Sequence, residues 1–327
     1  MRRNSIRPED LVKENLRLYA ADLEVLMEGR RYFVEVPCPA CGHDISELSF
    51  VKGGFDHKKC RACDTLYISP RPPFDMLIDY YKTAKSIKHW NDVIFPATEA
   101  MRRREIFEPR AWDVHVACKI YGVPFDSLVD VGAGFGTFCM AVEKMGSFSR
   151  VIAVEPSPQL AETCRNRGLE VLEGAIEAVD LEAASVITAF ELAEHLFCPR
   201  KFLEDCHRAL VKDGLLIMTT PNIKGFDLVM QGAQSQNIGG PNHLQFFHPN
   251  SLTTLVEKIG LEVLSITTPG KLDVEIVRDA ALSGELKLGP FLSDLLLDRW
   301  AELGGSFQKF LQDNNMSSHM MMIARKV

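Results

Sequence analysis

The chain has 327 residues, of which 46% are hydrophobic and 25% are charged. This composition is that of a globular protein of about two domains, and it excludes fibrous, collagen-like and low-complexity chains. With 37 basic and 44 acidic residues, the net charge of −7 gives no general attraction to nucleic acid or to an anionic membrane. No apolar run approaches the roughly 20 residues of a membrane span. The N-terminus leads into a charged stretch instead of an apolar signal core, so we expect a soluble, cytoplasmic protein without membrane insertion.

The first third of the chain is predicted to fall into three segments. Charged and apolar residues alternate at helical spacing over 8–28, which predicts an N-terminal helix within residues 1–33. Residues 34–72 change to short strand-like pieces with glycines and paired cysteines, and a proline-rich stretch ends them. Residues 73–122 are again mostly helical and form a linker or substrate-side segment.

Four of the nine cysteines form two Cys-x-x-Cys pairs that 18 residues separate: Cys38, Cys41, Cys60 and Cys63. This is the spacing of a zinc ribbon, in which four thiolates close a tetrahedron and leave no position for water. We therefore predict a structural zinc ion over residues 34–72, with a redox pair as the alternative. His43 and His57 lie near enough to serve as ligands, but we predict that neither does. The other five cysteines are interpreted as small core residues in a reducing compartment.

From about residue 125, short apolar runs alternate with amphipathic helices, which is typical of a parallel α/β sheet. The predicted strands are 128–131, 151–154, 169–172, 186–189, 215–219, 261–266 and 320–324, and the predicted helices are 137–145, 158–167 and 199–210. A mostly helical insertion at about 271–312 separates the last two strands.

The first of these strands runs into Gly132-Ala133-Gly134-Phe135-Gly136 and then into a helix. Glycines allow a tight turn and close approach of a ligand, and the helix N–H groups then face that ligand; a plain strand-to-helix turn is the alternative. The dinucleotide fingerprint would place its third glycine at Thr137, whereas here it is Gly136, and Asp130 stands two places before the first glycine. Glu155 ends the second strand, where an acid accepts hydrogen bonds from both ribose hydroxyls.

These residues resemble motif I of the class I S-adenosylmethionine (SAM) methyltransferases and the acid that follows it. Residues 189–196 are similar to the segment after the fourth strand in the ubiquinone-type and sugar methyltransferase branches, and 210–222 and 243–249 are similar to later segments of that family. The resemblance covers roughly 125–327. It implies a seven-stranded Rossmann-like sheet with an antiparallel last strand, in a SAM-binding domain over 123–327.

The resemblance also implies a set of cofactor-binding residues. They are Asp130, Gly132, Ala133, Gly134, Gly136, Glu155, Pro156, Ala175, Ile176, Phe190 and Glu191. Because Ala175 stands where an acid often contacts the adenine amino group, we expect backbone groups and apolar stacking near Ala175 and Ile176 to hold the ring. The ribbon, the proline-rich stretch and Tyr80-Tyr81 resemble bacterial methyltransferases of sugar and surface-polysaccharide pathways, in which the ribbon is part of the substrate-side lobe.

Methyl transfer needs a positioned acceptor and a base, for which histidine is suited. His195 follows the fourth strand, and His243 lies in a Gly/Asn/Gln-rich segment, 221–247, that is long enough to be a substrate loop or lid. A structural contact is the alternative for each histidine. Glu191, Glu194 and His195 would share a face if their segment is helical; some ubiquinone-type relatives use such a cluster for a divalent metal, although local pairing of Glu194 is the favoured interpretation.

The sequence thus predicts a SAM-dependent methyltransferase with a small-molecule acceptor, for which a nucleotide- or lipid-linked sugar is favoured. An RNA or protein acceptor is the first alternative, and the 18 acidic against 10 basic residues over 123–270 weigh against RNA. A non-catalytic zinc-ribbon adaptor is the second. Arg102-Arg103-Arg104 is a solvated helix face or, less favoured, a contact for an acceptor phosphate. The insertion 271–312 is expected to be a lid or a homodimer surface.

Overall fold

The structure is a computed structural model that describes residues 3–176, 178–179, 181 and 183–327. Its chain divides into two compact units, each assembled from separate stretches of sequence. The ribbon unit consists of Met1–Ala97, Pro221–Ser251 and Thr267–Met320, and the sheet unit consists of Thr98–Thr220, Leu252–Ile266 and Met321–Val327. The domain boundaries at residues 33, 72 and 122 stay a prediction.

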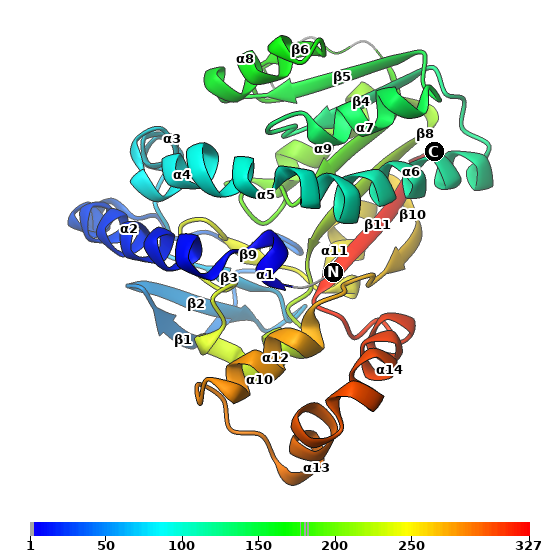
Figure 1. Ribbon diagram of the computed structural model, residues 1–327. Coiled ribbons are helices and arrows are strands. Elements are labelled where there is room, and N and C mark those ends of the chain that lie inside the picture. Colours follow the sequence, from blue (N-terminus) through cyan, green and yellow to red (C-terminus); the bar gives the residue numbers. More distant parts are fainter. Residues whose placement is uncertain (1–2, 177, 180, 182) are drawn as a thin grey trace. The chain divides into compact units, whose positions relative to one another are not determined.

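The sheet unit contains the predicted α/β sheet. Its strands are β4 (Ser127–Val131), β5 (Arg150–Glu155), β6 (Glu170–Glu173), β7 (Ala184–Phe190), β8 (Leu210–Pro221), β10 (Leu261–Thr267) and β11 (His319–Lys326). Within the described residues they form a seven-stranded sheet of order β10-β11-β8-β7-β4-β5-β6 (Figure 1). β4 pairs in parallel with β5 and β7, β5 with β6, and β7 with β8. The chain therefore reverses direction across the sheet at β4, the switch point where open α/β sheets bind ligands.

Helices flank these strands. They are α5 (Phe95–Arg102), the short π-helix η3 (Arg103–Phe107), α6 (Glu108–Tyr121), α7 (Thr137–Met145), α8 (Pro158–Asn166), α9 (Pro199–Ala209) and α11 (Pro249–Glu257). Pro158 and Pro199 begin α8 and α9, where a missing N–H loses no helical hydrogen bond. Strand residues such as Leu128 and Val186 pack with Phe138 of α7 in one buried core cluster. The alternation of apolar strands with amphipathic helices is thus confirmed.

The ribbon unit begins with helices and a small sheet. Its first elements are α1 (Arg3–Ile6), α2 (Glu9–Glu28), a 3₁₀ turn at Arg30–Tyr32, β1 (Ser46–Lys52), β2 (Phe55–Cys60), β3 (Leu66–Ile68), α3 (Phe74–Thr83), α4 (Lys85–His89) and a π-turn at Trp90–Ile94. In the described part of the chain, β1, β2 and β3 form a four-stranded antiparallel sheet with β9 (Gln245–Phe246). That last strand comes from a distant part of the sequence and was not predicted.

The predicted insertion is helical. It contains α12 (Asp273–Leu282), α13 (Pro290–Ser293), the π-turn η5 (Asp294–Asp298) and α14 (Trp300–Asp313). Val277, Leu296 and Leu311 form a buried cluster there, against which Phe226 of α10 (Phe226–Gln231) packs. The segment 221–247 contains α10, a 3₁₀ turn at Gly232–Gln234 and β9, and its role as a substrate loop or lid stays a prediction.

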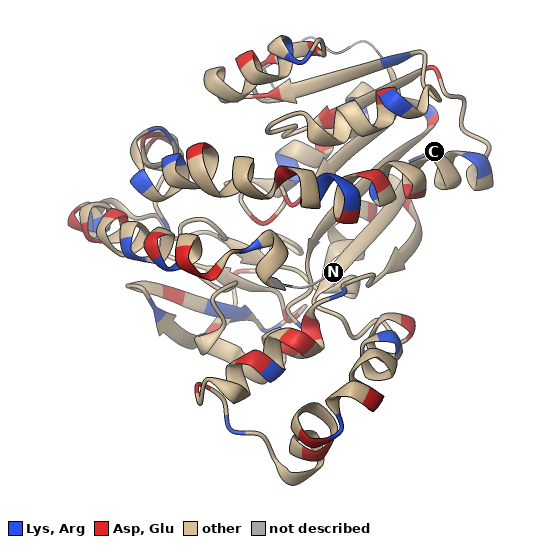
Figure 2. Cartoon of the chain, in the orientation of Figure 1, with Lys and Arg blue, Asp and Glu red and all other residues tan. Residues whose placement is uncertain are grey.

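Charged residues of both signs are distributed along the helices. Figure 2 shows acidic and basic residues interspersed along α2 and along the line from α5 to α6. Among the residues that the structure describes, no helix is both long enough and apolar enough to cross a bilayer.

Candidate active site

The turn after β4 has a backbone that favours glycine. Gly132, Gly134 and Gly136 have φ angles of +77°, +57° and +70°, a region that other residues rarely adopt. The Gly132 amide donates to the Val154 carbonyl at 2.9 Å, which ties the turn to β5. A Cβ at Gly136 would overlap the Leu169 side chain, whereas one at Gly134 would meet no atom within 4 Å. The third glycine is therefore required by packing, and the second borders open space.

Glu155 lies at the end of β5, with 5% of its surface exposed. Its Oε2 accepts the Gly134 amide at 2.8 Å, and its Oε1 accepts the Ser157 amide at 2.9 Å. Burial raises the pKa of Glu155, and the two amides act in the opposite direction. Because a carboxylate oxygen has two acceptor sites, each oxygen can accept one further donor. A pair of vicinal hydroxyls is such a donor set, so the geometry fits the predicted ribose contact.

Asp130 lies beneath the glycine turn. Its Oδ1 accepts the Thr188 hydroxyl at 2.7 Å, and its Oδ2 accepts the Cys139 thiol at 3.7 Å. Burial raises the pKa of Asp130 to about 7. These contacts join β4 to β7 and α7, which gives Asp130 a role in holding the turn in place; its predicted contact with the cofactor stays a prediction.

The predicted adenine segment follows β6. The Gly174 amide donates to the Glu155 carbonyl at 3.1 Å, which brings this segment beside the ribose acid. Ile176 is buried, Ala175 is half-buried and Pro156 is exposed. The structure thus brings Glu155, the glycine turn and the Ala175–Ile176 segment together at the carboxyl edge of β4, β5 and β6.

The segment after β7 is a tight turn, so the helical face on which Glu191, Glu194 and His195 were to lie together does not form. Glu191 has a φ of +52°, which breaks helical geometry at its first residue. Glu194 is 1% exposed and accepts the Thr220 hydroxyl at 2.8 Å. Burial, and then the charge of Glu191, raise the pKa of Glu194 far above its ordinary range. The His195 Nε2 lies 3.8 Å from the Glu194 Oε1, so local pairing describes Glu194.

Arg110 of α6 is a residue that sequence reasoning missed. Its guanidinium carbon lies 4.9 Å from the centre of the Phe190 ring, and its Nη2 lies 3.2 Å from the Glu191 Oε1. The same carboxylate oxygen accepts the Thr219 hydroxyl at 2.7 Å. Arg110 therefore fixes both residues that were predicted to bind the cofactor after β7. No local signal marks it, because its partners lie 80 positions further along the chain.

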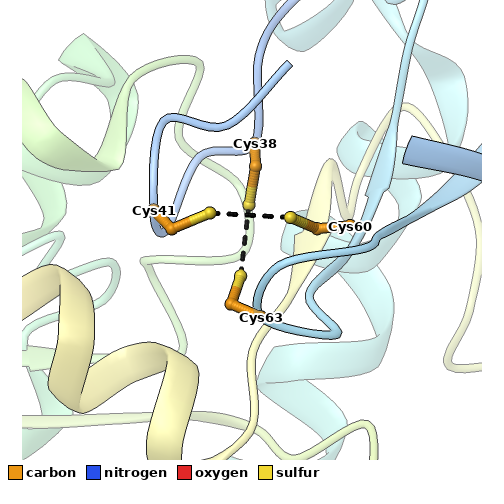
Figure 3. Close-up of side chains that lie close together, drawn as sticks. All are labelled: Cys38, Cys41, Cys60 and Cys63. Atoms are coloured by element: carbon orange, nitrogen blue, oxygen red, sulfur yellow. Dashed lines mark hydrogen bonds between the residues drawn. The ribbon is translucent and has the colours of Figure 1, made fainter. Parts of the chain in front are cut away.

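The four cysteines converge in the ribbon unit (Figure 3). The Sγ atoms of Cys38 and Cys63 lie 3.5 Å apart, as do those of Cys41 and Cys60, and all four sulfurs lie within 4.8 Å of one another. Zinc–sulfur bonds of about 2.3 Å place the corners of a tetrahedron about 3.8 Å apart. The donor set and its spacing are therefore compatible with a structural zinc ion.

The two histidines near this cluster make contacts with backbone groups. The Nδ1 of His43 accepts the Ile45 amide at 3.2 Å, and the Nδ1 of His57 lies 3.2 Å from the Phe55 carbonyl. Neither belongs to the group of sulfur atoms.

His243 lies in the ribbon unit, and His195 lies in the sheet unit. The Nδ1 of His243 is 2.8 Å from the Asn237 carbonyl. A carbonyl only accepts, so Nδ1 carries the proton and Nε2 is the basic nitrogen of the neutral ring. The ring also packs edge-on against Phe246 at 5.6 Å. These contacts hold His243 in the tautomer that a base acting through Nε2 requires.

The three consecutive arginines pair along their own helix. Arg102 donates to the Thr98 hydroxyl at 2.9 Å, and Arg104 lies 2.8 Å from Glu105. Arg103 lies 3.9 Å from Glu108. These pairs fit the solvated helix face that the sequence favours.

Several known proteins are similar to this chain. A family model described as a methyltransferase domain matches residues 99–266. The ubiquinone biosynthesis O-methyltransferase of Coxiella burnetii (strain Dugway 5J108-111) is 28% identical over 174 residues, which are 48% of this chain and 74% of that protein. The protein of the same name from Maricaulis maris is 30% identical over 156 residues, 43% of this chain and 61% of that protein. A SAM-dependent methyltransferase structure from Clostridium acetobutylicum has a TM-score of 0.47 at 10% identity, over 71% of this chain and 98% of that one.

Proposed function

This chain belongs to the methyltransferase family as a class I SAM-dependent enzyme, and on that premise we propose that it methylates a small molecule, with a nucleotide- or lipid-linked sugar as the favoured acceptor. The observation that carries the cofactor half of the proposal is the geometry of Glu155. Its buried carboxylate lies beside the positive-φ glycine turn and keeps one acceptor site on each oxygen.

The residues at the carboxyl edge fit SAM. Glu155 accepts the ribose hydroxyls, the space beside Gly134 admits the ligand against the main chain, and Ala175 and Ile176 flank the adenine. Arg110 holds Phe190 and Glu191 on the other side of the switch point. Bound SAM supplies an electrophilic methyl group on a sulfonium ion.

His243 is the favoured base. Its Nδ1–H is engaged by the Asn237 carbonyl, so the Nε2 lone pair accepts the proton that the acceptor loses as its oxygen, nitrogen or carbon is methylated. His195 is the second candidate. The choice rests on the contact that fixes the tautomer of His243.

The acceptor proposal rests on the ribbon unit. The curated relatives are named for ubiquinone biosynthesis, and the family model ends before Thr267 and begins after Thr98. Most of the ribbon unit therefore lies outside the matched region, and the resemblance of its ribbon to that of sugar-pathway methyltransferases is what favours a sugar-linked acceptor. In this proposal the four cysteines hold a structural zinc ion, and the helices over 271–312 cover the acceptor or join two copies.

The experiment is transfer of isotope-labelled methyl from SAM into fractionated small molecules, with nucleotide-linked sugars, lipid-linked sugars and quinone precursors as separate fractions. Label in a sugar fraction, lost in Glu155→Ala and retained in the exposed control Glu170→Gln, is the expected result. Label only in the quinone precursors would show that the acceptor is a quinone precursor and not a linked sugar. Label only in RNA or protein would contradict a small-molecule acceptor altogether.

A further inference from the structure

The segment that follows His243 completes the sheet of the metal ribbon. β9 pairs antiparallel with β3, with Leu66 opposite Phe246 and Tyr67 opposite Gln245. The Ile68 amide donates to the Leu244 carbonyl at 2.9 Å, which extends this pairing to the residue next to His243. The backbone beside the proposed base is therefore an edge strand of the ribbon.

Two side chains strengthen this junction. The Nε2 of His248 lies 2.7 Å from the carbonyl oxygen of Cys63, one of the four cysteines, and so donates its proton to it. The Arg71 guanidinium donates to the Gln245 side-chain oxygen at 3.0 Å. Arg71 is 3% exposed and Gln245 is fully buried. Buried hydrogen bonds of this kind are costly to break, because the partner that remains is left with less compensation for the water that it lost on folding.

The Cys60–Cys63 turn thus connects the four cysteines to residues 242–248, the segment that contains His243 and that we call the base loop. A metal ion bound by all four sulfurs, which lie within 4.8 Å of one another, would constrain the Cys60–Cys63 turn, and this constraint is lost when the metal is removed. The Cys63 carbonyl moves with that turn, and His248 loses a fixed acceptor. A metal ion bound by all four cysteines would have no free position, and it would act on the rest of the protein through the groups that contact its ligands.

We propose that the four-cysteine centre positions His243, with His248 and Gln245 as the positioning residues that connect the two. This proposal rests on the proposed role of His243 as the base. It assigns the ribbon a part in the acceptor half of the reaction, separate from SAM binding. Loss of the link is expected to lower kcat and to leave the SAM dissociation constant unchanged.

The test is hydrogen exchange of the peptide 242–248 in the zinc-loaded full chain, for the wild type and for His248→Ala. Exchange of this peptide is expected to become at least about tenfold faster in the variant, with one zinc retained and SAM affinity unchanged; kcat is expected to fall about 10–100-fold. His248→Gln keeps an N–H donor and restores part of both effects. His43→Ala is the matched control, since His43 adjoins the other cysteine pair and contacts Ile45 instead of the base loop.

Unchanged exchange of 242–248 in His248→Ala would overturn the proposal. If the variant does not fold, chelation of the wild-type protein gives the same test, because faster exchange must then spread from 34–72 to 242–248. Chelation that leaves 242–248 protected would equally overturn it. The exchange result does not depend on activity: a wild-type protein that transfers no methyl group to any acceptor would refute the proposed function, and the coupling would still be decided by exchange.

Discussion

The glycine turn and the cysteine ribbon are two small structures that hold a loop in place. They differ in how far apart in the sequence their contacting residues lie. The contacts of the glycine turn join residues that are moderately separated in the sequence: Glu155 lies 21 residues after Gly134, and Thr188 lies 58 residues after Asp130. The ribbon is joined to the base loop by contacts across 174 and 185 residues. The contacts of the ribbon with the base loop therefore span a much longer stretch of sequence than those of the glycine turn.

The glycine turn and the ribbon are also stabilised by separate sets of contacts. The glycine turn follows β4 directly and is held by β5 and by the core of the sheet unit. The large buried apolar side chains of residues 34–72 are Phe55, Leu66, Tyr67 and Ile68, and we expect a metal ion bound by the four cysteines to add to the rigidity that this small core provides. Changes to the ribbon should therefore leave SAM binding intact, and changes to the glycine turn should leave the ribbon intact.

The largest effect is expected from removal of the metal. A structural zinc ion contributes on the order of 10 kcal/mol to the folding of its module. Chelation, or Cys63→Ser, should abolish hydrogen-exchange protection over 34–72 while the strands of the sheet unit stay protected. SAM affinity, measured by calorimetry, should change less than about twofold. Loss of protection in both units together would contradict the independence of the ribbon and the sheet unit.

A smaller effect distinguishes two glycines of the same turn. Gly136→Ala should destabilise the sheet unit by about 3 kcal/mol, because its Cβ would overlap Leu169 and the Cys164 sulfur at a φ of +70°. Gly134→Ala should cost only the roughly 1–2 kcal/mol of a left-handed residue, since no atom lies within 4 Å. Gly134→Val, whose side chain enters the ligand space, should instead abolish SAM binding.

Chemical denaturation measures the first two values, and calorimetry measures the third. Equal destabilisation by Gly134→Ala and Gly136→Ala would show that the space beside Gly134 is not open. Normal SAM affinity in Gly134→Val would remove this turn from the cofactor site.

The pH dependence of stability should change in Asp130→Asn. The folded protein holds the Asp130 proton up to a pKa of about 7, whereas an unfolded chain releases it near 4. Protonation therefore favours the folded state, and this contribution is lost as the pH rises from about 4 to 7, by at most about 1.4 kcal/mol per pH unit. Asp130→Asn should flatten that slope, and Asp126→Asn, an exposed carboxylate on the same approach to β4, should not. Identical slopes in all three proteins would contradict the buried position of Asp130.

The same contrast explains what sequence reasoning could and could not predict. The alternation of strands, glycines and helices predicted the sheet, the glycine turn and the position of Glu155. These features could be predicted because a buried strand and a positive-φ turn leave signals in consecutive residues. The spacing of the cysteines predicted the four-cysteine cluster for the same reason. Arg110, the pairing of β9 with β3 and the His248–Cys63 contact left no such signal, because each joins residues that only the folded chain brings together. The turn at Glu191 was not predicted, because a positive φ at a glutamate leaves no signal in residue propensities.

The smallest effect is expected at the exposed arginines. Arg103→Ala with Arg104→Ala removes two surface ion pairs with Glu108 and Glu105, and such pairs contribute about 0–1 kcal/mol. Denaturation should show a change within about 0.5 kcal/mol, and kcat/KM should stay within twofold. A tenfold loss of kcat/KM would instead indicate that these arginines bind an acceptor phosphate.

The central proposal is that Glu155 binds the cofactor and that His243 is the base. Calorimetric titration of SAM into Glu155→Gln and His243→Gln, with methyl transfer measured in parallel, tests it most directly. Glu155→Gln replaces two charged acceptor oxygens with one neutral acceptor oxygen and one donor, which should weaken SAM binding about 100-fold. His243→Gln should bind SAM normally and transfer methyl groups at least about 100 times more slowly. Normal SAM affinity in Glu155→Gln, or normal transfer by His243→Gln, would contradict the account.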